Sequence, residues 1–410
     1  MKPETEAGVD TGAVARWLAG GARPAAQANE FMAQLCKRLV ACGIPLWRTA
    51  IFVRTLHPAV MGRRFMWRQD TGVRISEAGF DRLEDDDYLA SPVTHVYGTG
   101  LPLRRRLAAA DCPADFPILD EFRAEGVTDY LVSPLFFTNG EIQVATWSTR
   151  QPGGFTEAQL AGIETVLAPL ARIAEIYALR RTASTLLDAY VGRQAGERIL
   201  AGRIRRGDSE AIHAAIWMSD MRGFTALADM LPPPALLALL NRWFDCQVPA
   251  IVEHGGEVLK FIGDGLLAIF PVGGNAAAAP AACDAAVAAA RAARARIAAA
   301  DDLAVLAGGA RPRFGLALHV GEVLFGNIGG GNRLDFTCIG PAVNLAARLE
   351  KLTGETGHPI LVSGEFAQHC RQQLVPVGAF SLRGIGAAQM VFALADDGLR
   401  GAAPAQGPPP

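Results

Sequence analysis

The chain has 410 residues, 50% of them apolar and 20% charged, so it is too long for a typical single core and too apolar for a disordered protein. Its formal net charge of −2 gives no electrostatic reason to bind nucleic acid or an acidic membrane surface. We therefore expect a globular protein of two domains and a connector, with no nucleic-acid or membrane partner.

The cysteines and the N-terminus indicate a reducing compartment. The seven cysteines are odd in number and form neither a C-x-x-C pair nor the Cys/His spacing of a zinc site. No apolar segment follows a basic start, so no secretory signal is predicted. Residues 276–300 are alanine-rich but carry Asp284 and three arginines, which leaves no apolar run long enough to cross a membrane. We expect a cytoplasmic protein with a soluble helix there.

Helical and strand patterns alternate over the first part of the chain. Residues 1–25 are small and polar and are expected to form a flexible lead-in. Apolar residues at helical spacing predict a helix over 30–42 with Gly43 as its C-cap. Strands are predicted over 47–56, 64–69, 131–137 and 141–147, and a helix from Thr156 to about Tyr177. Asn139-Gly140 between the last two strands predicts a hairpin with a type I′ turn.

The helix–sheet–helix order of residues 26–177 resembles a GAF domain, including the closing hairpin and the helix that leads out. The resemblance implies an α/β sensor domain with a possible small-molecule ligand. No chemically diagnostic motif accompanies it. A folded domain that only dimerises accounts for the same pattern, and both interpretations stay open.

Residues 178–210 are predicted to form a helical linker. One helical face is apolar, which suits a short parallel coiled coil, while Gly192 and Gly196 weaken a rigid rod. The apolar set is Leu179, Leu186, Leu187, Tyr190, Val191, Ile199 and Leu200. The basic segment 203–208 is expected to be a solvated boundary.

A second domain is predicted over residues 211–396, followed by a disordered Pro/Ala/Gly-rich tail over 397–410. Strands are predicted over 211–219, 257–261, 266–270, 313–320, 323–327, 335–338 and 360–362, and helices over the alanine-rich stretch and 342–352. Three prolines at 232–234 start another helix, which Pro249 should kink or interrupt.

Two aspartates of this domain lie next to turns. Asp220 follows an apolar strand and precedes Gly223, Phe224 and Thr225 at the start of a helix, where unpaired amides can bind an anion. Asp264 lies in the turn Gly263-Asp264-Gly265. Taken alone, each is better explained as a cap or a turn residue. Together they offer the pair of carboxylates that two divalent cations need to activate an oxygen and clamp a triphosphate.

Four further side chains suit a purine nucleotide. Lys260 can donate to a ring nitrogen, and the Thr337 hydroxyl can donate to or accept from an amino-purine edge. Asn344 and Arg348 are four residues apart and share one helix face. Lys260 and Thr337 also have an ordinary explanation as strand residues.

The segments MSDMRGFTAL, GGEVLKFIGDGLLAIF, ALHVGEVLFGNIG and RLDFTCIGPAVNLAARLE together closely resemble the catalytic domain of class III nucleotidyl cyclases over about 211–394. The resemblance implies an α+β, ferredoxin-like (βαββαβ) domain that converts ATP to 3′,5′-cyclic AMP and pyrophosphate. It implies two Mg²⁺ or Mn²⁺ ions per site, held by Asp220, Asp264 and the Met221 carbonyl.

The same resemblance assigns roles to the other residues. Gly223, Phe224 and Thr225 would bind phosphate through backbone amides, Lys260 and Thr337 would read adenine, Asn344 would orient the ribose, and Arg348 would stabilise charge on the α-phosphoryl oxygens. It also implies a head-to-tail homodimer with metal ligands from one subunit and the other four side chains from its partner.

One position departs from the family pattern. Gln389 stands where many relatives have a phosphate-binding lysine, and Arg383 is the nearest cation. Either Arg383 replaces that lysine or nucleotide affinity is low. The alternatives are a guanylate cyclase, which Lys260 and Thr337 argue against, and a nucleotide-binding regulator without turnover.

Overall fold

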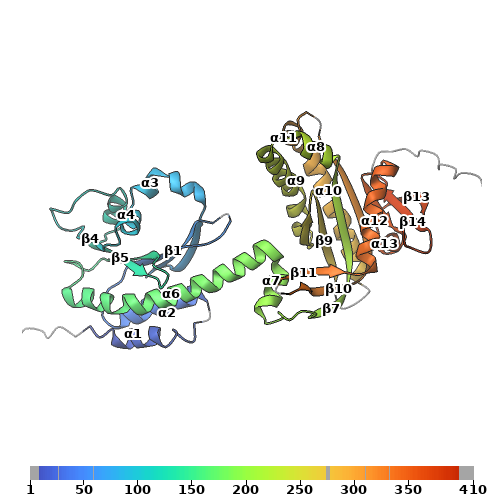
Figure 1. Ribbon diagram of the computed structural model, residues 1–410. Coiled ribbons are helices and arrows are strands. Elements are labelled where there is room, and N and C mark those ends of the chain that lie inside the picture. The colour runs from blue at the N-terminus through green and yellow to red at the C-terminus, as the bar shows by residue number, and fades with distance from the viewer. Residues whose placement is uncertain are drawn as a thin grey trace, which may run out of the picture. The chain divides into compact units, whose positions relative to one another are not determined.

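The computed structural model describes residues 9–25, 27–58, 60–273, 278–309, 311–331 and 333–396. The chain divides into two compact units, Met1–Leu186 and Leu187–Pro410, and each is described by itself (Figure 1). The predicted disordered tail lies outside the described residues. No helix in the described part of the chain is long and apolar enough to cross a membrane.

The first unit has a six-stranded antiparallel sheet with the strand order β3-β2-β1-β6-β5-β4. Its strands are β1 Arg48–Arg54, β2 Gly62–Arg68, β3 Gly72–Ala78, β4 Leu103–Arg105, β5 Asp129–Phe136 and β6 Ile142–Thr149. Its helices are α1 Gly12–Ala19, α2 Ala28–Ala41, the 3-10 helix η1 Phe80–Glu84, α3 Asp86–Leu89, α4 Pro92–Thr99, α5 Ile118–Ala124 and α6 Glu157–Val191.

Both faces of this sheet are covered because apolar side chains alternate along its strands. Trp147 of β6 faces a core shared with α1, α2 and α6, whereas Val132 of β5 faces a core shared with α4 and α5. The predicted helix–sheet–helix order is therefore present. Each of these two side chains is fully buried.

Three predictions for this unit are wrong. The segment predicted as a flexible lead-in contains α1, whose Val14 and Leu18 are buried in the core. The β5–β6 turn is not type I′, because Gly140 has a positive φ (85°) and Asn139 does not. The last helix does not end near Tyr177 but continues to Val191. In addition, β3, β4 and the elements from η1 to α5 were not predicted.

The segment predicted as a linker is divided by one glycine. Gly192, with φ 86°, separates α6 from α7 Arg193–Leu200. Helix α7 is packed rather than free, because Ala195 is fully buried and the Gln194 N–H donates to Glu257 Oε1 at 3.0 Å. The start of the second unit is therefore upstream of residue 211.

The second unit has an eight-stranded sheet with the order β13-β14-β12-β10-β7-β9-β8 and with β11 paired to β10. Its strands are β7 Ser209–Arg222, β8 Glu257–Ile262, β9 Gly265–Val272, β10 Arg313–Gly330, β11 Arg333–Ile339, β12 Ile360–Ser363, β13 Leu374–Phe380 and β14 Gln389–Leu394. Its further helices are α8 Phe224–Met230, α9 Pro233–Glu253, α10 Ala279–Ala299, α11 Asp301–Leu306, α12 Pro341–Thr356 and α13 Gly364–His369.

The predicted βαββαβ arrangement is present in this sheet. Strands β7, β8, β9 and β10 lie in the order β10-β7-β9-β8, with α8 and α9 between β7 and β8 and α10 and α11 between β9 and β10. Trp217 of β7 packs with α9 and α10, and its neighbour Ile216 points to the other face, where Ala346 of α12 packs. The sheet thus separates two helical layers.

Two predictions for this unit are wrong. Strand β10 is one strand of 18 residues, because Gly321 and Glu322 stay in register with β7 instead of forming a turn. Helix α9 runs through Pro249 to Glu253 without interruption. The alanine-rich segment forms the packed helix α10, in agreement with the prediction of a soluble helix. The helix predicted to start at residues 223–225 is present as α8, whereas helices α11 and α13 and strands β13 and β14 were not predicted.

His319 makes the stability of this unit dependent on pH. Its ring is buried, with Nδ1 2.8 Å from Ser363 Oγ, and burial followed by the charge of His213 lowers the pKa of His319 to about 4. The unfolded chain therefore binds a proton between pH 6.5 and 4 that the folded chain excludes. We expect the free energy of unfolding to fall by up to about 3 kcal/mol as the pH drops from 7 to 4.

Hydrogen exchange of β10 amides, corrected for the intrinsic pH effect, measures this loss. His319→Gln keeps a polar partner for Ser363 but does not titrate, so its β10 protection should change less with pH. An unchanged pH slope in the variant would show that His319 is not the cause.

Candidate active site

Asp220 and Asp264 lie side by side at one end of the second sheet. Asp220 is near the end of β7, and Asp264 is in the turn between β8 and β9. Asp264 Oδ2 accepts the Met221 N–H at 3.1 Å, which fixes that carboxylate against the backbone that follows Asp220. The structure therefore brings together the three residues predicted to bind metal.

The turn that carries Asp264 is held tightly in place. The positive φ falls on Gly263 (61°), the first central position, as in a type II′ turn. A side chain at Gly265 would collide with the Ser219 carbonyl oxygen of β7, so only glycine permits this approach. The Trp243 indole N–H of α9 donates to the Asp264 carbonyl at 3.1 Å. These contacts set the separation of the two carboxyl groups.

The local electrostatics favour a cation. Burial, and next the hydrogen bond and negative charge of Asp264, raise the pKa of Asp220 to about 7. Two adjacent carboxyl groups resist double ionisation unless a positive charge lies between them. In the described part of the chain, no cluster of three or more His, Cys, Asp or Glu side chains could hold a metal alone. Two carboxylates completed by substrate phosphates are the usual ligand set for Mg²⁺, so the pair fits such an ion.

The predicted phosphate-binding segment starts a short helix. Gly223 adopts a left-handed conformation (φ 82°), and α8 begins at Phe224. The amides of Phe224 and Thr225 are in the first turn, where backbone N–H groups have no partner within the helix. Their contact with phosphate remains a prediction.

Lys260 and Thr337 line one cavity of about 630 Å³. Lys260 is on β8 and Thr337 is on β11, which itself pairs only with β10. Lys260 Nζ donates to Asp335 Oδ2 at 2.5 Å, and this bond lowers the pKa of Asp335. Asp335 was missed by the sequence analysis although it precedes Thr337 by two residues and so faces the same side of β11.

Asn344 and Arg348 are both on α12, as predicted. Asn344 is exposed and Arg348 is half-buried. The Arg348 guanidinium lies against Gly384, in the loop between β13 and β14 that also carries Arg383. Gln389 is the first residue of β14, and its amide donates to the Ala387 carbonyl at 3.1 Å.

An ion pair that sequence reasoning missed joins β7 to α12. The Arg222 guanidinium donates to Glu350 Oε1 and to the Glu350 carbonyl, each at 2.5 Å, and also to Thr353 Oγ1. Gly315 of β10 leaves room for this guanidinium, because a side chain there would come 2.7 Å from Arg222 Nε. Arg222 thus connects the strand of Asp220 with the helix of Arg348. Gly315, a glycine inside a predicted strand, was the sequence signal that another group approaches β10 closely at this point.

The predicted site residues form separate groups in one chain. The cavity that contains Lys260 and Thr337 is not lined by Asp220 or Asp264, nor by Asn344 or Arg348. The carboxylates are at the β7 end and the β8–β9 turn, while Thr337 faces Gly326 at the far part of β10. A single chain therefore does not place all the predicted groups around one pocket.

The fold and the carboxylate pair define an α+β domain of the βαββαβ type with a candidate cation site. Residues 209–395 match the family described as "Adenylate and Guanylate cyclase catalytic domain". This part of the chain is therefore similar to the catalytic domains of that family.

Individual relatives resemble the same part of the chain. An adenylate cyclase of Anabaena cylindrica is 32% identical over 164 residues, which are 39% of this chain and 31% of the relative. The crystal structure of the adenylyl cyclase CyaB from P. aeruginosa aligns with 46% of this chain and 96% of that one, at 27% identity and a TM-score of 0.42. The guanylyl cyclase Cya2 aligns with 46% and 93%, at 27% identity and a TM-score of 0.39.

The chain spans about a third of the length of the curated relatives it matches. Both adenylyl and guanylyl cyclases are among the similar structures.

Proposed function

We propose that the protein is an adenylate cyclase that converts ATP to 3′,5′-cyclic AMP and pyrophosphate. The observation that carries this proposal is the cavity shared by Lys260 and Thr337 in a cyclase catalytic domain. The Lys260 ammonium can donate to a purine ring nitrogen, and the Thr337 hydroxyl can accept from the 6-amino group of adenine. Guanine has a carbonyl at that position, so its recognition favours a side chain that donates to this oxygen and an acidic side chain that accepts from the ring N–H and the 2-amino group.

The chain's own residues would bind and orient the triphosphate. Amides of Gly223, Phe224 and Thr225 would receive phosphate oxygens, and Asn344 would hold the ribose. The 3′-oxygen then attacks the α-phosphorus while the bond to the β-phosphate oxygen breaks. Arg348 would stabilise the negative charge that builds on the α-phosphoryl oxygens.

The carboxylate pair is suited to bind cations for this reaction. Asp220 and Asp264, with the Met221 carbonyl, would hold two Mg²⁺ or Mn²⁺ ions, whose charge would favour the ionised 3′-hydroxyl and neutralise the triphosphate. Asp264 is in turn oriented by the Met221 N–H. Arg383, exposed beside Arg348, is the candidate for the cation missing at Gln389.

A complete site needs two chains in this proposal. Lys260 and Thr337 line a cavity without the carboxylates, and Asn344 is exposed on α12. In a head-to-tail homodimer, one protomer supplies Asp220 and Asp264 and its partner supplies the nucleotide-binding side chains. An isologous arrangement of this kind gives two equivalent sites.

We assign a regulatory role to the first unit, as a GAF-like sensor domain. Its support is the helix–sheet–helix architecture and the continuous helix α6, which begins in that unit and ends at Val191, a residue of the second unit.

Purified full-length protein with Mn²⁺ should form cyclic AMP from ATP, measured by chromatography of the products. Asp264→Asn removes one negative charge from the cation site, so we expect activity to fall by about a hundredfold or more. Asp302→Asn, an exposed aspartate of α11 paired with Arg242, is the matched control and should keep full activity. Activity that survives Asp264→Asn would refute its assignment as a metal ligand.

Base preference tests the difference from a guanylate cyclase. Lys260→Glu combined with Thr337→Cys replaces the donor and acceptor pattern for adenine, so the ratio of ATP to GTP turnover should fall by tenfold or more. The measurement is kcat/KM for both nucleotides. A ratio equal to that of the native protein would show that these residues do not read the base.

Subunit mixing tests the shared site. Asp264→Ala and Asn344→Ala chains should each be inactive, but a mixed dimer contains one intact site and one doubly altered site. Random assortment should then restore about a quarter of native activity. Mixing Asp264→Ala with Asp220→Ala is the matched control, because both changes fall in the same half-site and no intact site can form. Failure of the first mixture to recover would argue against a site built from two chains.

A further inference from the structure

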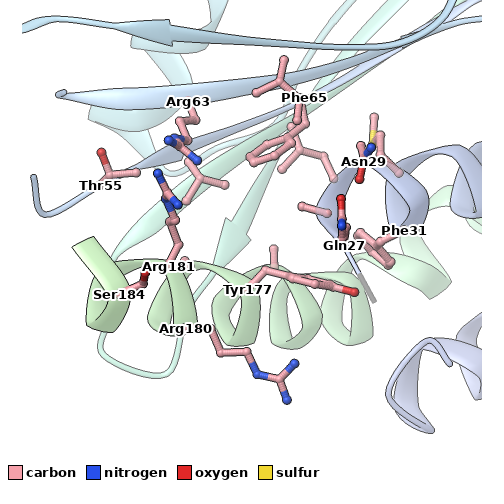
Figure 2. Close-up of a pocket in the computed structure, with 17 residues that line it drawn as sticks. Gln27, Asn29, Phe31, Thr55, Arg63, Phe65, Tyr177, Arg180, Arg181 and Ser184 are labelled. Carbon is pink, nitrogen blue, oxygen red and sulfur yellow. The ribbon is translucent and has the colours of Figure 1, made fainter. Parts of the chain in front are cut away.

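The first unit contains a cavity of about 500 Å³ between α2, α6 and the β1–β3 part of its sheet (Figure 2). All of its lining residues belong to this unit. Its volume is within the range of pockets that enclose small organic ligands. The cavity is far in sequence from every residue of the cyclase catalytic domain and has no part in the proposed reaction.

Most of the cavity wall is apolar. Ile51 and Val53 of β1 and Phe31 of α2 are buried side chains, and Phe65 of β2 and Tyr177 of α6 complete the apolar part. The Phe31 and Tyr177 rings are 5.4 Å apart between centroids. The Tyr177 hydroxyl is already bonded to the Ala25 carbonyl at 2.9 Å, so this residue offers its ring to the cavity. Such a wall suits a hydrocarbon body.

The other end of the cavity is cationic. Figure 2 shows the guanidinium groups of Arg63 on β2 and Arg181 on α6 directed toward one another, with Ser184 nearby. A smaller adjoining cavity is lined by the same two arginines. Arg63 pairs with Glu77, whereas Arg181 has no hydrogen bond or ion pair within the described residues. The two guanidinium groups of Arg63 and Arg181 therefore face each other, and only the Arg63 guanidinium has a carboxylate partner, that of Glu77.

The net charge of this end selects the ligand. At the facing pair, Arg63 and Arg181 contribute two positive charges and Glu77, paired with Arg63, one negative charge, which leaves a single unbalanced positive charge between them; Arg180 also lines the cavity, with its guanidinium directed away from this pair. An amphiphile with one negative charge balances it, while a neutral or cationic ligand leaves the two guanidinium groups in mutual repulsion. Guanidinium groups bind carboxylates through paired N–H donors, and the Ser184 hydroxyl can add another donor.

We propose that this cavity is a binding site for a small amphipathic carboxylate. Its hydrocarbon body lies against Ile51, Val53, Phe65 and the Phe31–Tyr177 pair, and its carboxylate is held by Arg181 together with Arg63. The site is independent of the cyclase reaction, so its test does not depend on turnover.

Calorimetric titration of the full-length protein with decanoate, below its micelle concentration, tests the site. Decanoate should bind at least about tenfold more tightly than 1-decanol, because one charge-assisted hydrogen bond is worth that factor or more. Decyl phosphate, which carries a second negative charge at pH 8, should bind more weakly than decanoate. Equal affinity for decanoate and 1-decanol would overturn the carboxylate assignment.

Two neighbouring arginines give a matched pair of variants. Arg181→Gln should lower decanoate affinity about tenfold or more and leave 1-decanol affinity unchanged. Arg180→Gln removes the same charge from the next residue, which also lines the cavity but whose guanidinium Figure 2 shows pointing away from Arg63 and Arg181, and should lower decanoate affinity much less than Arg181→Gln does. If both variants lose affinity equally, general attraction rather than this site binds the acid.

Ala178→Trp places a large side chain in the cavity and should abolish binding of both decanoate and 1-decanol while the circular dichroism stays native. Binding that persists in this variant would place the ligand elsewhere. If decanoate does not bind the native protein and Ala178→Trp instead lowers its sedimentation coefficient, a second copy of the chain covers this face and the ligand proposal is wrong.

Discussion

The second unit depends on one close backbone approach, where Gly265 of β9 meets the Ser219 carbonyl of β7. Two carboxyl groups stay in contact only if the scaffold resists their repulsion, and here the β7–β9 pairing does so. The strands are paired continuously from His213 to Ser219, so the end of β7 and the β8–β9 turn cannot move apart independently. Burial, and next the Asp264 carboxylate that this geometry holds in contact, raise the pKa of Asp220.

The strand β8 connects two parts of the second unit. At its start, the buried Glu257 carboxylate accepts the Gln194 N–H in the first turn of α7 and packs against Gly192. Three residues later the same strand carries Lys260. Burial removes water from the Glu257 carboxylate and raises its pKa. The start of helix α7 offsets part of this cost, because negative charge is favourable at a helix N-terminus. The break between α6 and α7 at Gly192 is therefore held against the sheet of the second unit by Glu257.

The sequence was most informative about local placement. The turn positions of Asp220 and Asp264 and the shared helix of Asn344 and Arg348 could be predicted because each is defined within a few residues, whereas their proposed roles came from the family resemblance. Contacts between distant segments were not predictable in the same way. The Arg222–Glu350 pair spans 128 residues, and only the fold brings the Lys260 and Asp335 side chains together.

Errors in secondary structure have identifiable physical causes. Gly321 and Glu322 looked like a turn because both are weak strand formers, yet the long pairing of β7 with β10 keeps them extended. Pro249 does not end α9, because packing of Ala250 and Ile251 in the core outweighs the lost hydrogen bond. Helix α1 escaped notice since only two of its residues, Val14 and Leu18, are buried. In each case tertiary packing overrides a local preference.

Like charges held face to face occur in both units, with opposite sign. Asp220 and Asp264 are fixed by strand backbone, whereas Arg63 and Arg181 reach toward each other from a strand and a helix. In both places the fold stabilises an arrangement that is electrostatically unfavourable alone, and a ligand of the opposite charge relieves it. Among the described residues no cationic side chain pairs directly with either carboxylate, so the proposed cations would supply the positive charge at that site. The arginines need only a single anion, because Glu77 already neutralises one of them. The two proposed ligands therefore differ because the chain leaves negative charge unbalanced at the aspartates and a single positive charge unbalanced at the arginines.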